Sequence, residues 1–589
     1  MASTFSGLEI GKSGLTAAQI GLNISGQNIS NADTDGYTMQ KVKTAPLEAV
    51  GGGYLIRQVT SSSNVGQGVA VLSIDQIRSA YLDQQYRNQY SDFSSDEYRS
   101  QGLSYLENLF NETDTSTSIT ASISSFFKAL NGFAEDTTSE AARTTVQQSA
   151  LSMTENFNMI YNEMVDLYND QNTSVKTVST QINQLSSQIA DLNKQIFEYE
   201  YSGQKANDLR DTRNRLLDEL SGYADISYEE ADDGMVNVSL CGETLVSGES
   251  SNSIGITTAT DEINSLCTNL SALNTEISGT SGGITDEQAN QRDSLIKSLK
   301  SVSDKISCTL ASDGTTSVTL QYVDNSTMTS ATKSLIDGSN TLTAAGTSET
   351  AEYDGADDEY VLKLGATYLN SDNVSSGELN AHLLLRDSDT ATNGGIPYYI
   401  SRMNDLAQTI AQTLNTCMNK GYTYPDDENG GQSVNGINLF KDLGTSCSLI
   451  TGGNFTLSDE VLKSVWNLAG SAEKIDLNST SGTTNAGNSV IATEMSKLAS
   501  TNGYSDCLDS IVSQLGLEVK SSKNSLSTRQ SLLESTEGQR QSVSGVSIDE
   551  EAVSLIKYQQ VYSACSRVVT TIDQMLEKLI NGTGTVGLS

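Results

Sequence analysis

The chain has 589 residues, of which 73 are acidic and 35 are basic, so its formal net charge is −38. A surface of that charge repels nucleic-acid phosphates and anionic lipid head groups, and neither a nucleic acid nor a membrane is expected as a partner. No apolar run approaches the ~18 residues that would span a bilayer, and the N-terminus lacks the basic and apolar segments of a secretory signal peptide. At about 150 residues per domain, the length predicts several domains.

Cysteine and histidine usage argues against an enzyme or a metalloprotein. The seven cysteines form no C-x-x-C pair and no spacing typical of metal ligands, which predicts buried free thiols. His382 is the only histidine, and this excludes most zinc sites and most histidine-based acid–base chemistry. We therefore expect no catalytic site, no metal and no other cofactor.

Apolar residues near the N-terminus recur every seven residues, at Leu8, Leu15, Leu22 and Ile29. This spacing forms one stripe along a helix and predicts a coiled-coil-like seam. The Asn, Asp and Gly residues between Asn31 and Gly36 indicate a turn that ends the helix, because these residues tolerate left-handed and turn geometry. After the turn, glycines mixed with β-branched residues predict a small β element near 41–75.

The middle of the chain changes character. An apolar stripe between Ile160 and Tyr199 predicts a long helix. From 223 to 375, alternating segments such as MVNVSLCGETLVSG and TTSVTLQYV predict a β-rich outer domain. Inside that domain, apolar residues at helical spacing predict a helical hairpin inserted at about 260–306, and helical patterning returns after it.

The C-terminal segment carries a fuller heptad, whose apolar positions alternate at three and four residues: Leu555, Tyr558, Tyr562, Cys565, Val569, Ile572, Leu576 and Leu579. A helix from near Ile548 to Ile580 would be ~50 Å long at 1.5 Å per residue. Two seam-forming helices at opposite ends of the chain can pair only if the residues between them form separate domains that lie outside the helix pair. That design suits a subunit that is stacked through its termini.

These elements predict an α+β multidomain fold with a discontinuous all-α core of long coiled-coil-like helices from both termini. We expect 1–40 and 545–589 to form a terminal helical axial domain. The segments 41–222 and 376–544 are expected to form a mainly helical core domain, and 223–375 the β-rich outer domain.

Three fragments imitate functional motifs, and each fails a physical requirement. Gly7–Ser13 resembles a P-loop but has three residues between its glycines instead of four, and no strand precedes it. Gly279–Gly283 matches G-x-S-x-G but follows a helical segment and lies in a Gly/Ser/Thr turn. Asn31, Asp33 and Asp35 echo a calcium loop, yet position one is not Asp and Val42 occupies the place of the bidentate Glu.

Both ends of the chain resemble the axial protein family of the bacterial flagellum, which includes rod, hook and hook-associated proteins. The N-terminal match, SGLTAAQIGLNISGQNISNADTDGY, uses Ser13, Gly14, Leu15, Ala17, Gln19, Leu22, Asn28, Ile29, Asn31, Thr34, Gly36 and Tyr37. The C-terminal match uses Glu550, Glu551, Gln559, Tyr562, Arg567, Met575 and Leu576. Two interior blocks, 207–226 and 377–387, resemble the type that forms the junction between hook and filament, and the resemblance covers about 1–240 and 375–589.

The resemblance implies a non-enzymatic structural subunit that leaves the cell through the flagellum-specific type III export channel and resides in the extracellular flagellum. Its implied partners are further copies in a homo-oligomeric ring, the hook protein, a second junction protein with the filament, and an export chaperone. We expect the two helix seams to form the assembly interface, with the family turn at Asn28, Asn31, Thr34, Gly36 and Tyr37.

Two alternatives stay open at this point. One is another flagellar axial protein, either a hook or a distal-rod protein, and the other is a secreted coiled-coil adhesin. An adhesin would not need two matched terminal helices and the Gly-Tyr turn, and a hook protein would lack the long helix near 145–200. The seven cysteines depart from the usual avoidance of cysteine in this family.

Overall fold

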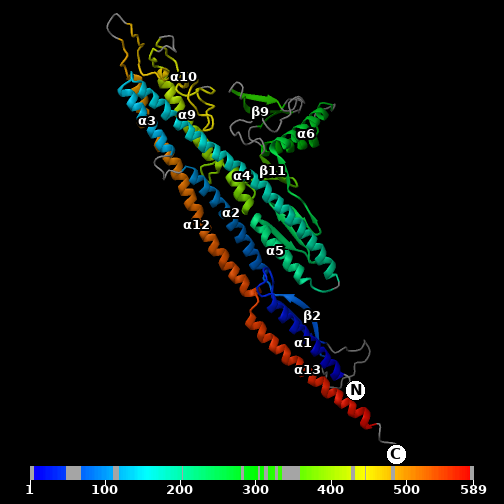
Figure 1. The fold of residues 1–589 in the computed structure, drawn as a ribbon. Helices are drawn as coiled ribbons and strands as arrows, with labels where there is room; N and C mark the ends of the chain where they lie inside the picture. The colour runs from blue at the N-terminus through cyan, green and yellow to red at the C-terminus, as the bar shows by residue number, and fades with distance from the viewer. Residues whose placement is uncertain are drawn as a thin grey trace, which may run out of the picture. The chain divides into compact units, whose positions relative to one another are not determined.

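A computed structural model describes residues 6–47, 68–110, 118–201, 203–279, 284–302, 306–310, 316–324, 329–334, 359–425, 432–444, 446–478 and 484–583. The chain divides into two compact units. Unit 1 comprises Met1–Phe93, Asn183–Asn252 and Arg529–Ser589, and unit 2 comprises Ser94–Ile182 and Ser253–Thr528. Helices α2 (Ala80–Phe110), α4 (Glu140–Glu200) and α12 (Tyr504–Ser544), which are labelled in Figure 1, each contribute residues to both units. Within the described ranges, no helix is long and apolar enough to cross a membrane.

Unit 1 combines the two terminal helices with a hairpin, a short helix and a small sheet. Its elements are α1 (Ser6–Ser30), β1 (Gln40–Pro46), β2 (Val69–Gln76), the first part of α2 (Ala80–Phe110), the last part of α4 (Glu140–Glu200), α5 (Asn207–Tyr223), β3 (Ile226–Glu230), β4 (Val236–Leu240), β5 (Glu243–Ser247), β6 (Ser250–Ser251), the last part of α12 (Tyr504–Ser544) and α13 (Ile548–Thr583). Strands β1 and β2 pair antiparallel, and β3 to β6 form an antiparallel meander in chain order.

The β3–β6 sheet of unit 1 is held to helices α4 and α5 by buried polar side chains. Alternate residues of β4 are buried, as the twofold period of a strand requires. Asn193 of α4 donates to the carbonyl oxygens of Val236 and Gly248, both at 2.8 Å. Arg213 of α5 donates to Asn193 Oδ1 at 3.0 Å and to the Gly234 carbonyl at 2.6 Å, and burial lowers its pKa to about 10.

Unit 2 contains the largest hydrophobic core and the remaining small sheets. Its further elements are α3 (Ile119–Glu135), β7 (Gly255–Thr258), α6 (Ala259–Gly279), α7 (Asp286–Val302), β8 (Ile306–Leu310), β9 (Thr316–Asp324), β10 (Thr329–Ser334), β11 (Tyr360–Leu364), β12 (Thr367–Leu369), α8 (Glu378–Asp387), α9 (Ile396–Met418), α10 (Asp459–Lys463), η3 (Val465–Asn467) and α11 (Val490–Asn502). The two sheets have the orders β10-β9-β8 and β12-β11-β7, and all pairs are antiparallel.

The predicted fold class is confirmed: the chain is mostly helical, its terminal helices pack together, and small antiparallel sheets lie in its middle. The long helix is α4, with 61 residues, although Tyr199 at the end of its predicted stripe is 49% exposed. Helices α6 and α7 occupy the predicted insertion at about 260–306. The predicted outer domain, 223–375, is shared between the two units. Most of the Gly279–Gly283 fragment lies outside the described residues.

Arg143 of α4 lies in the core of unit 2 and forms no ion pair with a carboxylate that the structure describes. It donates to the Thr137 carbonyl at 3.0 and 2.7 Å and to the Leu468 carbonyl at 2.5 Å. Its guanidinium carbon also lies 4.8 Å from the ring centroid of Phe133 and 5.1 Å from that of Trp466. Burial lowers the pKa of Arg143 to about 10. The side chain therefore joins α4 to the loops before it and near α10 through backbone carbonyls and aromatic rings.

We predict that Arg143→Met lowers the free energy of unfolding of the full-length chain by about 3 kcal/mol, because two buried carbonyls lose charged donors. Chemical denaturation followed by far-UV circular dichroism measures the change. Arg402→Met is the matched control, since Arg402 is 39% exposed and its ion pair with Asp405 is at 3.8 Å, so a change within about 0.5 kcal/mol is expected. Equal effects of the two substitutions would contradict a special role for Arg143.

Candidate assembly interface at the paired terminal helices

Helices α1 and α13 lie side by side along much of their lengths (Figure 1). Glycines of α1 face side chains of α13: a Cβ atom added at Gly7 would lie 2.8 Å from Ile572, at Gly11 2.7 Å from Val569, at Gly14 2.7 Å from Cys565 and at Gly21 2.5 Å from Tyr558. Contacts this short leave no room for a side chain on the α1 side unless the facing side chain of α13 moves. The two backbones approach closely because α1 carries glycine at these positions.

The small residues of α1 continue the same spacing. Gly7, Gly11, Gly14, Ala18, Gly21, Ser25 and Asn28 follow one another at alternating steps of four and three, with Ala18 and Ser25 buried. The apolar residues assigned to the seam from the sequence, Leu8, Leu15, Leu22 and Ile29, each lie one position further along the helix and are half-buried. The face of α1 toward α13 is thus made of small residues, with the larger ones beside it.

On α13 some heptad positions are at least half-buried, and others are exposed. Tyr558, Val569 and Ile572 lie against the glycines of α1, and Leu555 and Leu576 are half-buried. Tyr562 and Leu579 are exposed, at 41% and 54%. The described part of α1 therefore covers only some of the predicted seam positions on α13.

We predict that Gly14→Cys forms an intramolecular disulfide with Cys565 under mild oxidation by oxidised glutathione. A Cβ atom at position 14 lies 3.7 Å from the Cβ of Cys565, which is within the range that disulfides adopt once the Cys565 thiol rotates away. Peptide mapping by mass spectrometry of the monomeric full-length chain measures the bond. Gly26→Cys, on the same helix with nothing within 4 Å of its added Cβ, is the control that should not cross-link to Cys565.

The family turn follows α1 directly and is held by its own hydrogen bonds. Thr34 N–H donates to the Asn31 carbonyl at 3.0 Å, and Tyr37 N–H donates to the Thr34 carbonyl at 3.1 Å. The Thr34 hydroxyl also donates to Asn31 Oδ1 at 3.2 Å. Gly36 has φ of +76°, a left-handed conformation that glycine adopts without steric cost.

Asn28 connects the turn to both terminal helices. Its Oδ1 accepts from the Tyr37 hydroxyl at 2.8 Å and from Gln40 N–H at 3.1 Å. Its Nδ2 donates to the Gln40 carbonyl at 2.9 Å and to Glu551 Oε1 of α13 at 2.8 Å. The side chain is completely buried, and all four of its hydrogen-bonding positions are filled. Burial raises the pKa of Tyr37 to about 12 and keeps its hydroxyl a donor.

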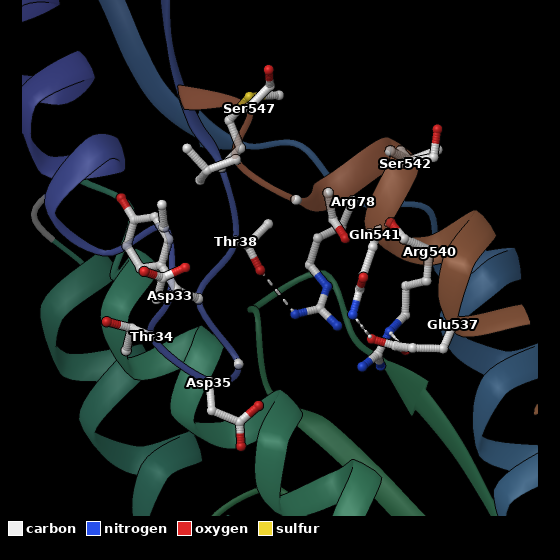
Figure 2. A pocket seen from close by; sticks show the side chains of 18 of the residues that line it. Asp33, Thr34, Asp35, Thr38, Arg78, Glu537, Arg540, Gln541, Ser542 and Ser547 are labelled. Carbon is white, nitrogen blue, oxygen red and sulfur yellow. Dashed lines mark hydrogen bonds and ion pairs between the residues drawn. The ribbon is translucent and has the colours of Figure 1, made fainter. Parts of the chain in front are cut away.

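Beside the turn, Arg78, the first turns of α2, α5 and the end of α12 form a layer of paired charges. Arg78 binds Asp83 through two hydrogen bonds of 3.0 and 2.9 Å. Arg540 pairs with Asp218 at 2.6 Å and with Glu537 at 2.8 Å. Met39 N–H donates to the Ser544 carbonyl at 2.9 Å, which joins the turn to the last residue of α12. Figure 2 shows Arg78 and Arg540 on the side of the cavity opposite Asp33 and Asp35.

Two cavities border the turn. One has a volume of about 600 Å³ and lies between residues 32–39, Arg215 and Asp218 of α5, and residues 537–547 at the joint between α12 and α13. The other, of about 240 Å³, lies between the turn and α5 and includes Asp208 and Asp211. Across the part of the chain that the structure describes, no group of three or more histidine, cysteine or acidic side chains could hold a metal ion.

Asp211 is buried where α5 meets the turn. Its Oδ2 accepts from Thr38 N–H at 3.2 Å, while its Oδ1 is 3.7 Å from Arg78 Nη1. Burial is the largest cause that raises its pKa, to about 6, and the charge of Asp208 acts in the same direction. The hydrogen bond from Thr38 and the charge of Arg78 lower the pKa and offset part of this shift.

We predict that Asp211→Asn changes how stability depends on pH. The folded pKa of about 6 lies above the unfolded value near ~3.9, so the native state holds this proton more tightly, and the contribution of Asp211 to stability falls as pH rises from about 4 through 6. The substituted amide would still accept a hydrogen bond from Thr38 but cannot ionise. The thermal midpoint of the variant minus that of the wild type should therefore become more positive between pH 4 and pH 7. A difference that does not vary with pH would contradict the assignment.

Comparison with known proteins shows where the chain resembles others. The family model "Flagellar hook-associated protein FlgK helical domain" matches residues 103–262 and 255–434, which together span more than half of the chain. "Flagella basal body rod protein" matches residues 8–38, and "Flagellar basal body rod FlgEFG protein C-terminal" matches residues 538–582. The last two matches fall on the paired terminal helices and the turn.

Individual proteins are similar over nearly the whole length. Flagellar hook-associated protein 1 of Bacillus subtilis (strain 168) is 26% identical over 600 residues, covering 100% of both chains. Flagellar hook-associated protein 1 of Salmonella typhimurium is 24% identical over 583 residues, covering 97% of this chain and 98% of the relative. The flagellar hook junction protein FlgK from Burkholderia pseudomallei, a solved structure, aligns with a TM-score of 0.48 and 13% identity over 78% of this chain and 100% of the other.

The two terminal helices pair with each other, and a long internal segment connects them. Both ends match flagellar rod protein families, so the chain is a structural subunit of the flagellar axis. The chain belongs to the flagellar hook-associated protein FlgK family. It is accordingly a structural component of the extracellular flagellum and not an enzyme, which confirms the class and location expected from the sequence.

Proposed function

We propose that copies of this chain assemble through α1 and α13 into a homo-oligomeric ring that joins the flagellar hook to the filament. The observation that carries this proposal is an apolar flank of α13 whose side chains are largely exposed in the part of the chain that the structure describes. Val561, Val568, Met575 and Leu579 are 41%, 46%, 64% and 54% exposed. Three of them recur at intervals of seven, so they line one side of the helix next to the seam. A second copy that covers this flank would bury apolar surface that a free chain exposes to water.

The charge distribution supports packing of like copies. In a chain of net charge −38, no acidic residue occurs between Glu9 and Asp33 or between Glu551 and Asp573. Most of each terminal helix is therefore free of the negative charge that dominates the rest of the sequence. Copies could bring these helices together without the like-charge repulsion that their other surfaces would generate.

The domain assignment belongs to the same proposal. The terminal segments, 1–40 and 545–589, would form the axial domain, with 41–222 and 376–544 as the helical core and 223–375 facing outward. The interface would use the helix seams together with the turn at Asn28, Asn31, Thr34, Gly36 and Tyr37. The hook protein, a second junction protein with the filament, and an export chaperone would be the remaining partners.

We predict that Val568→Asp prevents assembly without unfolding the monomer, because the new charge would be desolvated only where copies meet. In cells that lack the chromosomal copy, filaments attached per cell should fall by about tenfold or more. Electron microscopy counts the filaments, and circular dichroism checks the purified variant. Thr570→Asp, at an exposed polar position of the same helix, is the control that should retain filaments.

Immunogold labelling of intact flagella tests the location. A label confined to the point where hook and filament meet is expected of the wild-type chain. A label along the hook would indicate a hook protein, a label at the hook base a distal-rod protein, and a label over the cell surface an adhesin. Any of these three patterns would overturn the proposed junction role.

A further inference from the structure

The turn after α1 carries carboxylates that the chain itself does not neutralise. Asp33 and Asp35 are exposed, and neither forms an ion pair or hydrogen bond through its side chain with any residue that the structure describes. The nearby guanidinium groups are already engaged, since Arg78 pairs with Asp83 and Arg540 with Asp218 and Glu537. The turn therefore presents two negative charges without a partner.

A buried acidic group extends this site inward. Asp211 is only 7% exposed and lines the cavity of about 240 Å³ beside the turn, and its Oδ1 has no hydrogen-bond partner. The nearest cationic atom recorded for that oxygen is Arg78 Nη1, at 3.7 Å. Asp35 and Asp208 line the same cavity, against a single basic residue, Arg215, which is 3.7 Å from Glu219. The cavity thus combines an excess of carboxylates with a buried oxygen that lacks a donor.

The matching positive charge lies on α13. Arg567 is exposed and forms no ion pair with the described residues. Its neighbours two positions away, Cys565 and Val569, face Gly14 and Gly11 of α1. Because two residues correspond to ~200° around a helix, Arg567 points away from α1. No residue that the structure describes pairs with it there, so its guanidinium is available to a second copy.

We infer that Arg567 of one copy binds the turn carboxylates of a second copy, with Asp35 as its first contact and the cavity toward Asp211 behind it. A guanidinium group suits this role because its planar set of donors can bind two carboxylate oxygens at once. The inference rests on the proposed assembly into a ring and adds the charge pair that fixes how neighbouring copies are aligned. Apolar contact between the α13 helices of neighbouring copies would supply the attraction. The charge pair would determine how the two copies are aligned along their helices.

Charge reversal in the full-length chain tests the inference in cells that lack the chromosomal copy. We expect Arg567→Glu and the double substitution Asp33→Lys/Asp35→Lys each to reduce attached filaments by about tenfold. The triple variant that combines both changes should restore filaments to within about twofold of wild type, because the opposite charges then face each other again. Lys557→Glu, another reversal of an exposed basic residue on α13, is the matched control and should not be rescued by the two lysines.

The outcomes separate this inference from the proposed function. Circular dichroism of each purified variant should match the wild-type chain, since all four substituted positions are exposed. Normal filaments with Arg567→Glu, or a loss that the triple variant does not repair, would overturn the pairing even if wild-type protein labels the hook–filament joint. If Asp33→Lys/Asp35→Lys restored filaments to the Lys557→Glu variant, the pairing with Arg567 would also be overturned. The turn carboxylates would then bind Lys557 instead. Wild-type protein absent from that joint would instead refute the proposed function.

Discussion

Close approach of the α1 and α13 backbones is the constraint on which the arrangement of unit 1 depends. It requires a face of α1 made of small residues, and at four of its positions, opposite Tyr558, Cys565, Val569 and Ile572, that residue is glycine. Glycine in a helix interior costs about 0.5 to 1 kcal/mol relative to alanine, so α1 is intrinsically weak as an isolated helix. Its stability comes from contact with α13, and the two helices form one structural element.

The same pairing positions the turn and the charged layer beside it. Asn28 can satisfy Tyr37, Gln40 and Glu551 together only when α13 lies against α1. The hydrogen bond between Met39 and Ser544 then joins the turn to the end of α12, next to Arg540 and its carboxylates. Hydrophobic packing and polar contacts thus meet at one joint, which explains why family-type residues cluster there.

Periodicity in the sequence was sufficient to predict the helices at both ends, the long helix α4 and the inserted pair α6 and α7. It did not identify the contact face of α1, because reading for large apolar residues selects Leu8, Leu15, Leu22 and Ile29. The signal was nevertheless present in the alternating four- and three-residue spacing of Gly7, Gly11, Gly14, Ala18 and Gly21. The link from Asn28 to Glu551 could not be inferred from spacing, since it depends on how two distant helices are aligned. Arg143 was also missed, because its partners are backbone carbonyls.

The hydrogen bond between Asn28 and Glu551 spans 523 residues of sequence, and this separation has a consequence for the order of folding. A ribosome completes α1 among the first segments and α13 among the last. The glycine face of α1 therefore has no partner during almost the whole of synthesis, whereas the core of unit 2 can form from segments that appear between them. Bringing such distant ends together costs loop-closure entropy that grows only with the logarithm of length. If the intervening residues are already folded when α13 is made, the effective loop is shorter, and closing the ends becomes the final step of folding.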